Sequence, residues 1–369
     1  MNERAGLADW ALAGGTAVVH RGGDGRAKVV HRPVLFGQLG AVGDHGWGVE
    51  QCRRIKVHTP GQLVGLVPGL LGFQPSDSLV AVILRRGRVK LTARWDLAPA
   101  DHPAMARRLC HGPGRLVEPG DEVCLIGYGR RGPIEVGLAA VRQELGDVVR
   151  QGLIVDGDRW WYDDEPASAP GQLRPPPAQS MAHLVSRGAV AASRQELADS
   201  IAPPTGQRED DLMAELVGII EQTTEDQPVA EAERAMAAID RFVAGQTLSD
   251  ADFLSAGVAM TSGLGRDVLW RQLTRDNAGD QEPFWREVAR RTPSGLRAIP
   301  LAVTGLVAWV AGHGAMMNIC LDEAATADPD HPLIGLLAQI AEGGVPPTWW
   351  DGIQASLSGR PAAAARPGG

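Results

Sequence analysis

One loop and the end of a nearby strand carry polar residues that could bind a small molecule. The loop at residues 72–78 follows an expected helix and opens an expected strand, whose hairpin partner ends near residue 96. The candidate ligand-binding residues of these two segments are Gln74, Ser76, Asp77, Ser78, Arg94 and Asp96. In the alternative, structural interpretation, Asp77 and Ser78 bond loop amides and Arg94 pairs with Asp96 or Asp77.

A glycine-rich loop at residues 127–132 has the spacing of a phosphate-binding turn. It follows an expected strand and opens an expected helix, whose first amides could face a phosphate. The residues of this alternative site are Gly127, Gly129, Arg130, Arg131, Gly132 and Asp156. Asp156 would bind the ribose, but it lies 24 residues after Gly132, where about 20 is usual. A turn that needs glycine only for its conformation explains the same residues.

No set of residues predicts a catalytic or metal site. The chain has no G-x-S-x-G nucleophile elbow, and Cys110 and His111 are neighbours in sequence only. The acidic residues between 156 and 164 lack the spacing of a calcium loop, and we interpret them as solvated turn residues. We therefore predict no catalytic residue, no metal site and no cofactor, and leave open whether the protein is an enzyme.

Charge and composition disfavour nucleic acid and membranes as partners. Residues 166–369 hold 15 Lys and Arg against 25 Asp and Glu, and such an acidic half repels phosphates. A basic hairpin tip at residues 85–90 could touch phosphates, but it lacks interleaved aromatic residues. No apolar run is long enough for a membrane span, and the four scattered cysteines indicate reduced thiols. These features predict a cytoplasmic protein.

The stretch at residues 55–97 organises the first half of the chain. Thr59 is suited to cap a helix, Pro60 to its first position and Gly72 to its end. The apolar run at 79–84 predicts a strand covered on both faces, and the turn at 85–88 leads into a strand at 89–97. The candidate pocket residues therefore lie at one end of this hairpin.

Residues 70–80 carry the pattern Leu-Leu-Gly-Phe-x-Pro-x-x-Ser-Leu-Val, which leads into a strand, and a second strand ends near Arg94 and Asp96. In this pattern the stretch resembles an uncharacterised actinobacterial family, known as domain of unknown function 4192. Residues 184–197 and 309–346 are similar to later parts of that family. The resemblance implies kinship over about residues 55–351 and implies no chemistry.

Further patterns divide the chain into predicted units. Residues 1–54 form an N-terminal extension with a β-hairpin, and residues 55–165 an α/β domain. In that domain we also expect helices at 101–109 and 133–149, and strands at 122–126, 153–155 and 159–162. Residues 166–177 are a proline-rich linker, 178–355 an all-helical domain and 356–369 a disordered tail.

The second half predicts a series of helices joined by short breaks. The expected ranges are 178–187, 193–201, 208–222, 228–244, 249–261, 265–275, 280–290, 295–311, 315–327 and 332–342. Residues 296–330 have the length of a tetratricopeptide-like unit, with Gly305 at the small position where two helices approach. Stacked helical hairpins and a compact bundle remain equal alternatives.

The fold class that follows is a mixed sheet flanked by helices, followed by an all-α domain. We interpret the chain as a binding or scaffolding protein. Its helical half would engage a protein partner, and its α/β half would serve as a platform or small-ligand pocket. The alternative is a nucleotide-binding enzyme or sensor that uses the loop at residues 127–132.

Overall fold

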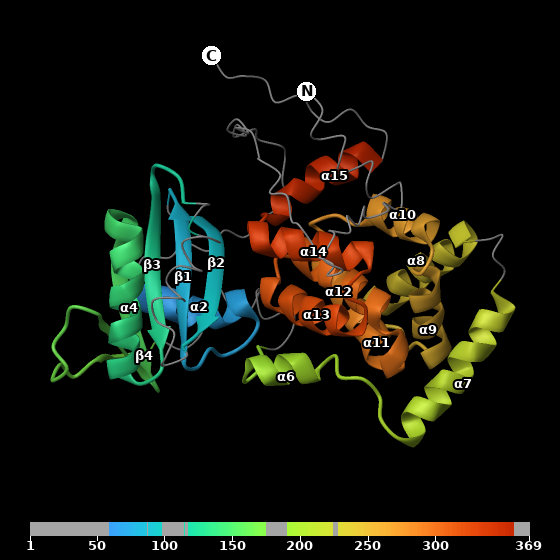
Figure 1. Ribbon diagram of the computed structural model, residues 1–369, viewed down its shortest axis with the longest axis horizontal. Helices are drawn as coiled ribbons and strands as arrows, with labels where there is room; N and C mark the ends of the chain where they lie inside the picture. Colours follow the sequence, from blue (N-terminus) through green and yellow to red (C-terminus); the bar gives the residue numbers. More distant parts are fainter. Residues whose placement is uncertain are drawn as a thin grey trace, which may run out of the picture.

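A sheet with helices on both faces is followed by a helical half (Figure 1). The computed structural model describes residues 59–86, 88–97, 114, 117–174, 190–223 and 228–357. The elements of the first half are α2 (Pro60–Leu71), β1 (Ser78–Arg85), β2 (Arg88–Asp96), β3 (Asp121–Tyr128), α4 (Arg131–Leu145), β4 (Val149–Asp156), β5 (Arg159–Tyr162) and β6 (Gln172–Leu173). This architecture confirms the predicted fold class.

Helix α2 begins and ends at the residues that the sequence indicates. The Thr59 hydroxyl accepts a hydrogen bond from the Gln62 N–H at 3.2 Å, and the Gln62 side chain accepts one from the Thr59 N–H at 3.3 Å. Pro60 occupies the first turn. At the other end Gly72 takes the left-handed conformation, with φ 78°, and donates to the Pro68 carbonyl. The loop that follows α2 is therefore fixed in direction.

The sheet has the strand order β2-β1-β3-β4-β5-β6. Strands β3 and β4 are parallel and are joined across one face by α4, whereas the other neighbours are antiparallel. Alternate residues of β1 point to opposite faces, so Val80 packs in the core with α2 and Leu79 packs with α4. Because β1 is covered on both faces, its nearly unbroken apolar sequence has a physical reason.

Part of the stretch predicted as a linker is attached to the sheet. Residues 172–173 form the edge strand β6, in which Leu173 pairs with Arg159. The Trp161 indole donates to the Ala169 carbonyl at 3.0 Å, and the Arg174 N–H donates to the Asp158 carbonyl. Proline is tolerated beside an edge strand because no further strand needs its missing N–H. The sheet thus extends to residue 173 within the predicted linker.

The second half contains helices separated by short turns. They are α6 (Arg194–Asp199), α7 (Gln207–Gln222), α8 (Pro228–Val243), α9 (Asp250–Ala259), α10 (Gly263–Gln272), α11 (Ala278–Arg291), α12 (Ala298–Val310), α13 (Gly314–Ala327), α14 (Pro332–Gly343) and α15 (Trp350–Leu357). A Cβ on Gly305 of α12 would lie 3.2 Å from Cys320 of α13, so Gly305 marks a close approach of these two helices. A tetratricopeptide-like arrangement remains a prediction.

One hydrophobic cluster contains buried residues of both halves. It includes Val67 of α2 and Val80 of β1, and it continues through Leu197 of α6 to Phe284 and Leu306 in the helical half. A second cluster lies between the sheet and α4. The face of the sheet that carries α2 is therefore joined by apolar packing to the helices that follow.

Several sequence predictions fall outside the described residues. These are the N-terminal extension with its hairpin, the helices expected at 101–109 and 178–187, and residues 358–369 of the tail.

Among the described residues both cysteines, Cys124 and Cys320, are buried free thiols, and burial raises the pKa of Cys124 to about 11. None of the described helices has the length and apolar character needed to cross a lipid bilayer.

Candidate functional site

A hollow of about 400 Å³ lies at the end of the sheet where β1 begins and β2 ends. Three segments enclose it: the loop after α2, the end of β2 and the start of α6. The residues that line it are Phe73, Gln74, Ser76, Asp77, Arg94, Asp96, Leu97, Ser193, Arg194 and Gln195. We call this cavity the interdomain hollow, because its walls come from both halves of the chain.

Backbone hydrogen bonds hold the loop of the hollow in place. The Leu97 N–H donates to the Asp77 carbonyl at 2.7 Å, which extends the β1–β2 pairing beyond the strand ends. Asp77 has a φ of 39°, in the left-handed region that aspartate tolerates better than most residues. Ala191 forms a bridge with Phe73, donating to the Gly72 carbonyl and accepting from the Gln74 N–H, each at 2.9 Å. The loop is thus fixed from two sides.

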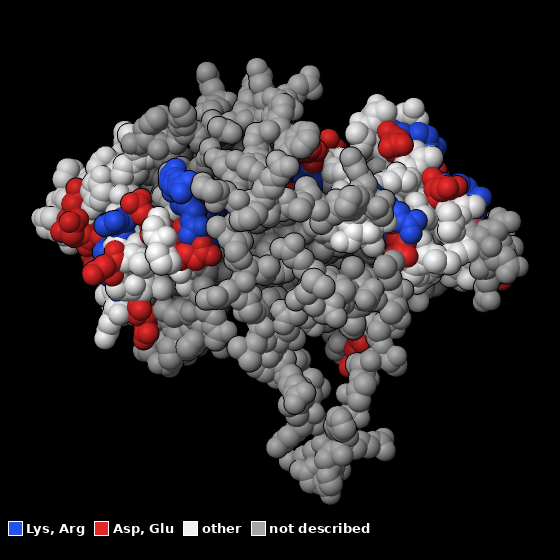
Figure 2. Space-filling view, turned by 90° about the horizontal axis from the view of Figure 1, so that it is seen from above, with Lys and Arg blue, Asp and Glu red and all other residues white. Residues whose placement is uncertain are grey.

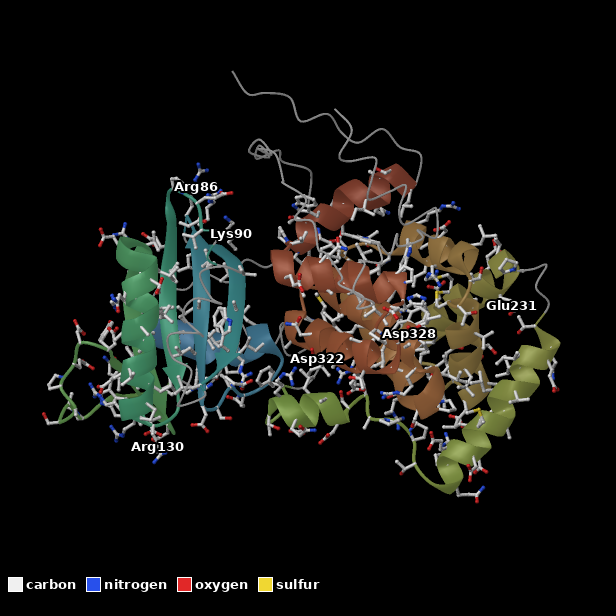
Figure 3. The ribbon with its side chains drawn as sticks, in the orientation of Figure 1. Arg86, Lys90, Arg130, Glu231, Asp322 and Asp328 are labelled. Carbon is white, nitrogen blue, oxygen red and sulfur yellow. The ribbon has the colours of Figure 1, made fainter. Side chains whose placement is uncertain are left out.

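The third wall is the first turn of α6. The Ser193 hydroxyl caps this helix by accepting a hydrogen bond from the Glu196 N–H at 3.0 Å. Arg194 pairs with Asp322 of α13 at 3.1 Å, and Figure 3 shows Asp322 on the part of α13 that lies above α6. Arg194 therefore lines the hollow and also binds another helix, α13.

Arg94 is the most constrained polar side chain of the hollow. Its side chain is 12% exposed, its Nη2 lies 2.5 Å from Asp96 Oδ1, and its guanidinium carbon lies 5.3 Å from the centre of the Phe73 ring. The Arg94 Nε is buried without a hydrogen-bond partner among the described residues. A buried donor without a partner costs about 1–3 kcal/mol, so such groups are rare in folded proteins.

Two further hydroxyls lie unpartnered on the same face of the β1–β2 pair. Ser78 is fully buried and pairs in register with Asp96, and its Oγ has no hydrogen-bond partner among the described residues. The Oγ1 of Thr92, two residues before Arg94, is likewise buried without a partner in the described part of the chain. The register Val80 to Arg94 and Val82 to Thr92 places all three groups on the face that carries α2. Of the three residues, Arg94 lines the hollow.

Five of the six residues predicted from the sequence line the hollow, and the sixth, Ser78, lies next to it in register with Asp96. Gln74 accepts a hydrogen bond from Arg174 at 3.1 Å. The pair between Arg94 and Asp96 is the one that the structural interpretation expected. Binding by these residues remains a prediction, because the structure establishes only their positions.

The contribution of α6 was missed by residue-level reasoning. Ser193, Arg194 and Gln195 follow more than a hundred residues after the loop, and no local pattern connects them with it. The available signal was the family-like segment at residues 184–197, which contains all three.

The glycine-rich loop has structural reasons for two of its glycines. A Cβ on Gly127 would lie 2.0 Å from Ile134 Cγ2, so this glycine lets α4 pack closely on β3. Gly129 has a φ of 134°, donates to the Val155 carbonyl at 2.9 Å and lies against Asp77. The loop is consequently a neighbour of the hollow at the same end of the sheet, and the two predicted sites share one region.

Among the other residues of this predicted site, Arg131 has side-chain partners in the sheet half. Arg131 pairs with Glu135 at 2.6 Å and donates to the carbonyls of Glu165 and Pro166. Asp156 is exposed in the β4–β5 hairpin, opposite Arg159 in the register. Nucleotide binding by this loop remains a prediction, with Arg131 already occupied by three oxygen partners.

The basic hairpin tip lies at the opposite end of the sheet and is partly neutralised. Figure 3 shows Arg86 and Lys90 at one end of the sheet and Arg130 at the other. Arg85 and Lys90 bind the buried carboxylate of Asp121 at 2.6 and 2.9 Å. Burial raises the pKa of the Asp121 carboxyl. Hydrogen bonds from Glu118, Lys90 and Arg85 have the larger, opposite effect, so the pKa lies below its usual range.

Charges of both signs are also mixed elsewhere. Figure 2 shows Lys and Arg side chains beside Asp and Glu side chains over both halves of the visible face.

In the described part of the chain, no three His, Cys, Asp or Glu side chains are grouped as metal ligands would be. Cys110 and His111, from which the sequence predicted no site, lie outside the described ranges with the rest of residues 101–113.

Comparison with known proteins gives a family and no activity. The model of a family described as a domain of unknown function, DUF4192, matches residues 60–348. No curated protein and no solved structure matches the chain. The matched range includes α2, the sheet, the interdomain hollow and the helices as far as the turn after α14. The chain therefore belongs to the DUF4192 family of domains of unknown function.

Proposed function

We propose that the protein binds a small polar molecule in the interdomain hollow. The observation that carries this proposal is the Nε of Arg94, a lining residue, which is buried without a hydrogen-bond partner among the described residues, as is Ser78 Oγ beside the hollow. Proteins seldom leave such groups unsatisfied, and a site that exchanges water for ligand is one common reason. The hollow, about 400 Å³, also falls in the range of small-molecule sites, roughly 300–1,000 Å³.

The lining favours binding over catalysis. It offers hydrogen-bonding side chains of several kinds, with Phe73 and Leu97 as apolar surface. Neither histidine nor cysteine is among the described lining residues, and the Ser193 hydroxyl is used as a helix cap. Such a set can orient a ligand, but it supplies no activated nucleophile. Engagement of a protein partner by the helical half remains a separate prediction.

A thermal-shift screen with a blocked variant tests the proposal. The panel contains free amino acids, the corresponding amines and carboxylic acids, nucleotides, sugars and sugar phosphates. Ser76→Trp places a large ring at an exposed lining position, and Ser356→Trp on α15 is the matched control. A ligand at a hundred times its dissociation constant adds about 2.7 kcal/mol to the free energy of unfolding.

We expect at least one compound to raise the melting temperature of the wild type and of Ser356→Trp, and not that of Ser76→Trp. The proposal fails if no compound stabilises the wild type, or if every stabilising compound acts equally on Ser76→Trp. A nucleotide that stabilises Ser76→Trp as well as the wild type would instead favour the glycine-rich loop as the binding site.

A further inference from the structure

We infer that the ligand of the interdomain hollow is a small zwitterion of the amino-acid class. Its carboxylate would bind Arg94 and its ammonium group would bind Asp77. This inference rests on the proposed function and gives it a ligand chemistry. The argument follows from the spare hydrogen-bonding capacity of these two side chains, their spacing and the balance of charge around them.

Arg94 has donors to spare and is held in place. A guanidinium group carries five N–H bonds. The partner of Arg94 among the described residues is Asp96, bound through one N–H of Nη2. This leaves the second N–H of Nη2, which can act in parallel with an N–H of a neighbouring guanidinium nitrogen. Phe73 and Asp96 fix the orientation of the group. A preorganised guanidinium with unused donors is suited to a carboxylate, which accepts two parallel hydrogen bonds.

Asp77 supplies the opposite charge. Its backbone is fixed by the Leu97 N–H, and its carboxylate lies over Gly129, where an added Cβ would be 2.9 Å from Asp77 Oδ1. Asp77 is exposed and has no ion-pair partner among the residues that the structure describes. Asp96, the other acid of the hollow, is already paired with Arg94. An ammonium group of a ligand would therefore find its free carboxylate at Asp77.

The spacing of the two groups suits a compact molecule. Arg94 is opposite Val80 in the register, and Val80 lies three residues after Asp77 in the chain. At a rise of about 3.3 Å per residue, the two backbone positions are about 10 Å apart along the strand. The bond from Arg94 to Asp96 directs the guanidinium group towards the loop and shortens this separation. A small molecule whose ammonium and carboxylate groups are attached to one carbon would fit between the two side chains.

The overall charge of the lining disfavours a multiply charged anion. The two arginines, Arg94 and Arg194, are balanced by the two aspartates, Asp77 and Asp96. Arg194 is also paired with Asp322 outside the hollow. A phosphate or dicarboxylate would be repelled by both acids, whereas a zwitterion places each of its charges beside an opposite one. Gln74, which accepts a hydrogen bond from Arg174, and Gln195, which donates one to Asp199, are the neutral polar residues beside these charges.

Isothermal titration calorimetry with matched compounds tests the inference. The tightest-binding amino acid from a panel of the twenty common ones is compared with its decarboxylated amine and its deaminated acid. For the wild type we expect each of these two compounds to bind at least tenfold more weakly than the amino acid. A loss of either charge would remove one of the two ion pairs.

Two variants assign the charges. Arg94→Gln should bind the amino acid and the amine within twofold of each other, because the carboxylate has lost its partner. Asp77→Asn should bind the amino acid and the acid within twofold of each other, and asparagine retains the backbone conformation at this position. The control variants are Arg234→Gln and Asp240→Asn on α8, where Arg234 pairs with Glu231 at the surface. Circular dichroism checks that each variant is folded.

The inference is overturned if no amino acid binds the wild type, or if the amine or acid binds as tightly as the amino acid. It is also overturned if Asp77→Asn still distinguishes the amino acid from the acid as the wild type does. In these cases binding of another compound that Ser76→Trp abolishes would leave the proposed function intact. If Ser76→Trp abolishes binding of no compound, the proposed function fails as well.

Discussion

Replacing Gly127 by alanine separates the two interpretations of the glycine-rich loop. If the glycines serve a phosphate, alanine at Gly127 or at Gly132 should weaken ligand binding and leave stability nearly unchanged. If they serve packing, only Gly127 should matter for stability. A Cβ at Gly127 would lie 2.0 Å from Ile134 Cγ2, whereas a Cβ at Gly132 would have no heavy atom within 4 Å.

The structure gives the expected size of the effect. Ile134 is fully buried between the sheet and α4, so the added methyl group must displace a packed helix. Overpacking of this kind costs about 1–3 kcal/mol. The reduced freedom of the unfolded chain returns about 0.4–1 kcal/mol. We therefore expect Gly127→Ala to lower the free energy of unfolding by about 1–2 kcal/mol, and Gly132→Ala in α4 to raise it by up to about 1 kcal/mol.

Urea denaturation followed by tryptophan fluorescence and circular dichroism measures both variants. The midpoint of Gly127→Ala should fall and that of Gly132→Ala should rise slightly, with unchanged dependence on urea. Equal destabilisation by the two substitutions, or a Gly127→Ala variant as stable as the wild type, would refute the packing argument. The loop would then require another reason for its glycines.

Three further predictions concern other parts of the fold. Thr59→Ala removes the cap of α2 and should lower the free energy of unfolding by about 1 kcal/mol in urea denaturation. Arg297→Met removes a buried guanidinium that binds Glu323 at 2.9 Å and two backbone carbonyls, and should cost about 2–4 kcal/mol by the same measurement. Burial raises the pKa of Asp250, but two arginine partners have the larger, opposite effect, so its pKa lies below the ordinary value of 3.8. Its ionised form therefore stabilises the fold above pH 3.8, and this contribution is lost as the pH falls through the lowered pKa. The stability difference between wild type and Asp250→Asn, measured over a pH series, should accordingly be present at pH 7 and shrink in acid.

Local signals in the sequence were sufficient for most elements of the first half. Thr59, Pro60 and Gly72 mark the ends of α2 in the structure as they do in the sequence. The helix expected at 133–149 ends earlier, at Leu145, because Gly146 takes a φ of 65° and the chain then enters β4. The apolar spacing continues to Val148 and so gave no sign of this end.

In the second half, nine of the predicted helices from 193 onwards correspond to α6–α14, because glycine and capping residues separate them. Helix α15 was not predicted, because the last expected helix ended at residue 342. Trp350 nevertheless begins this helix and is buried, donating to the Leu273 carbonyl at 2.8 Å.

The candidate site was predictable only where the chain is locally continuous. Arg94 could be placed near the loop because a hairpin brings the end of β2 back to the start of β1. The position of α6 depends on apolar packing between Leu197 and residues of the first half, which no short pattern expresses. Sequence reasoning therefore found two walls of the hollow and missed the third.

The bridge between Phe73 and Ala191 affects the order in which parts of the protein fold. Because more than a hundred residues separate these two positions, their contact closes a long loop and should form after the local strands and helices. During synthesis the sheet half leaves the ribosome before α6 exists. Binding competence would then appear in refolding experiments as a phase slower than the recovery of secondary structure.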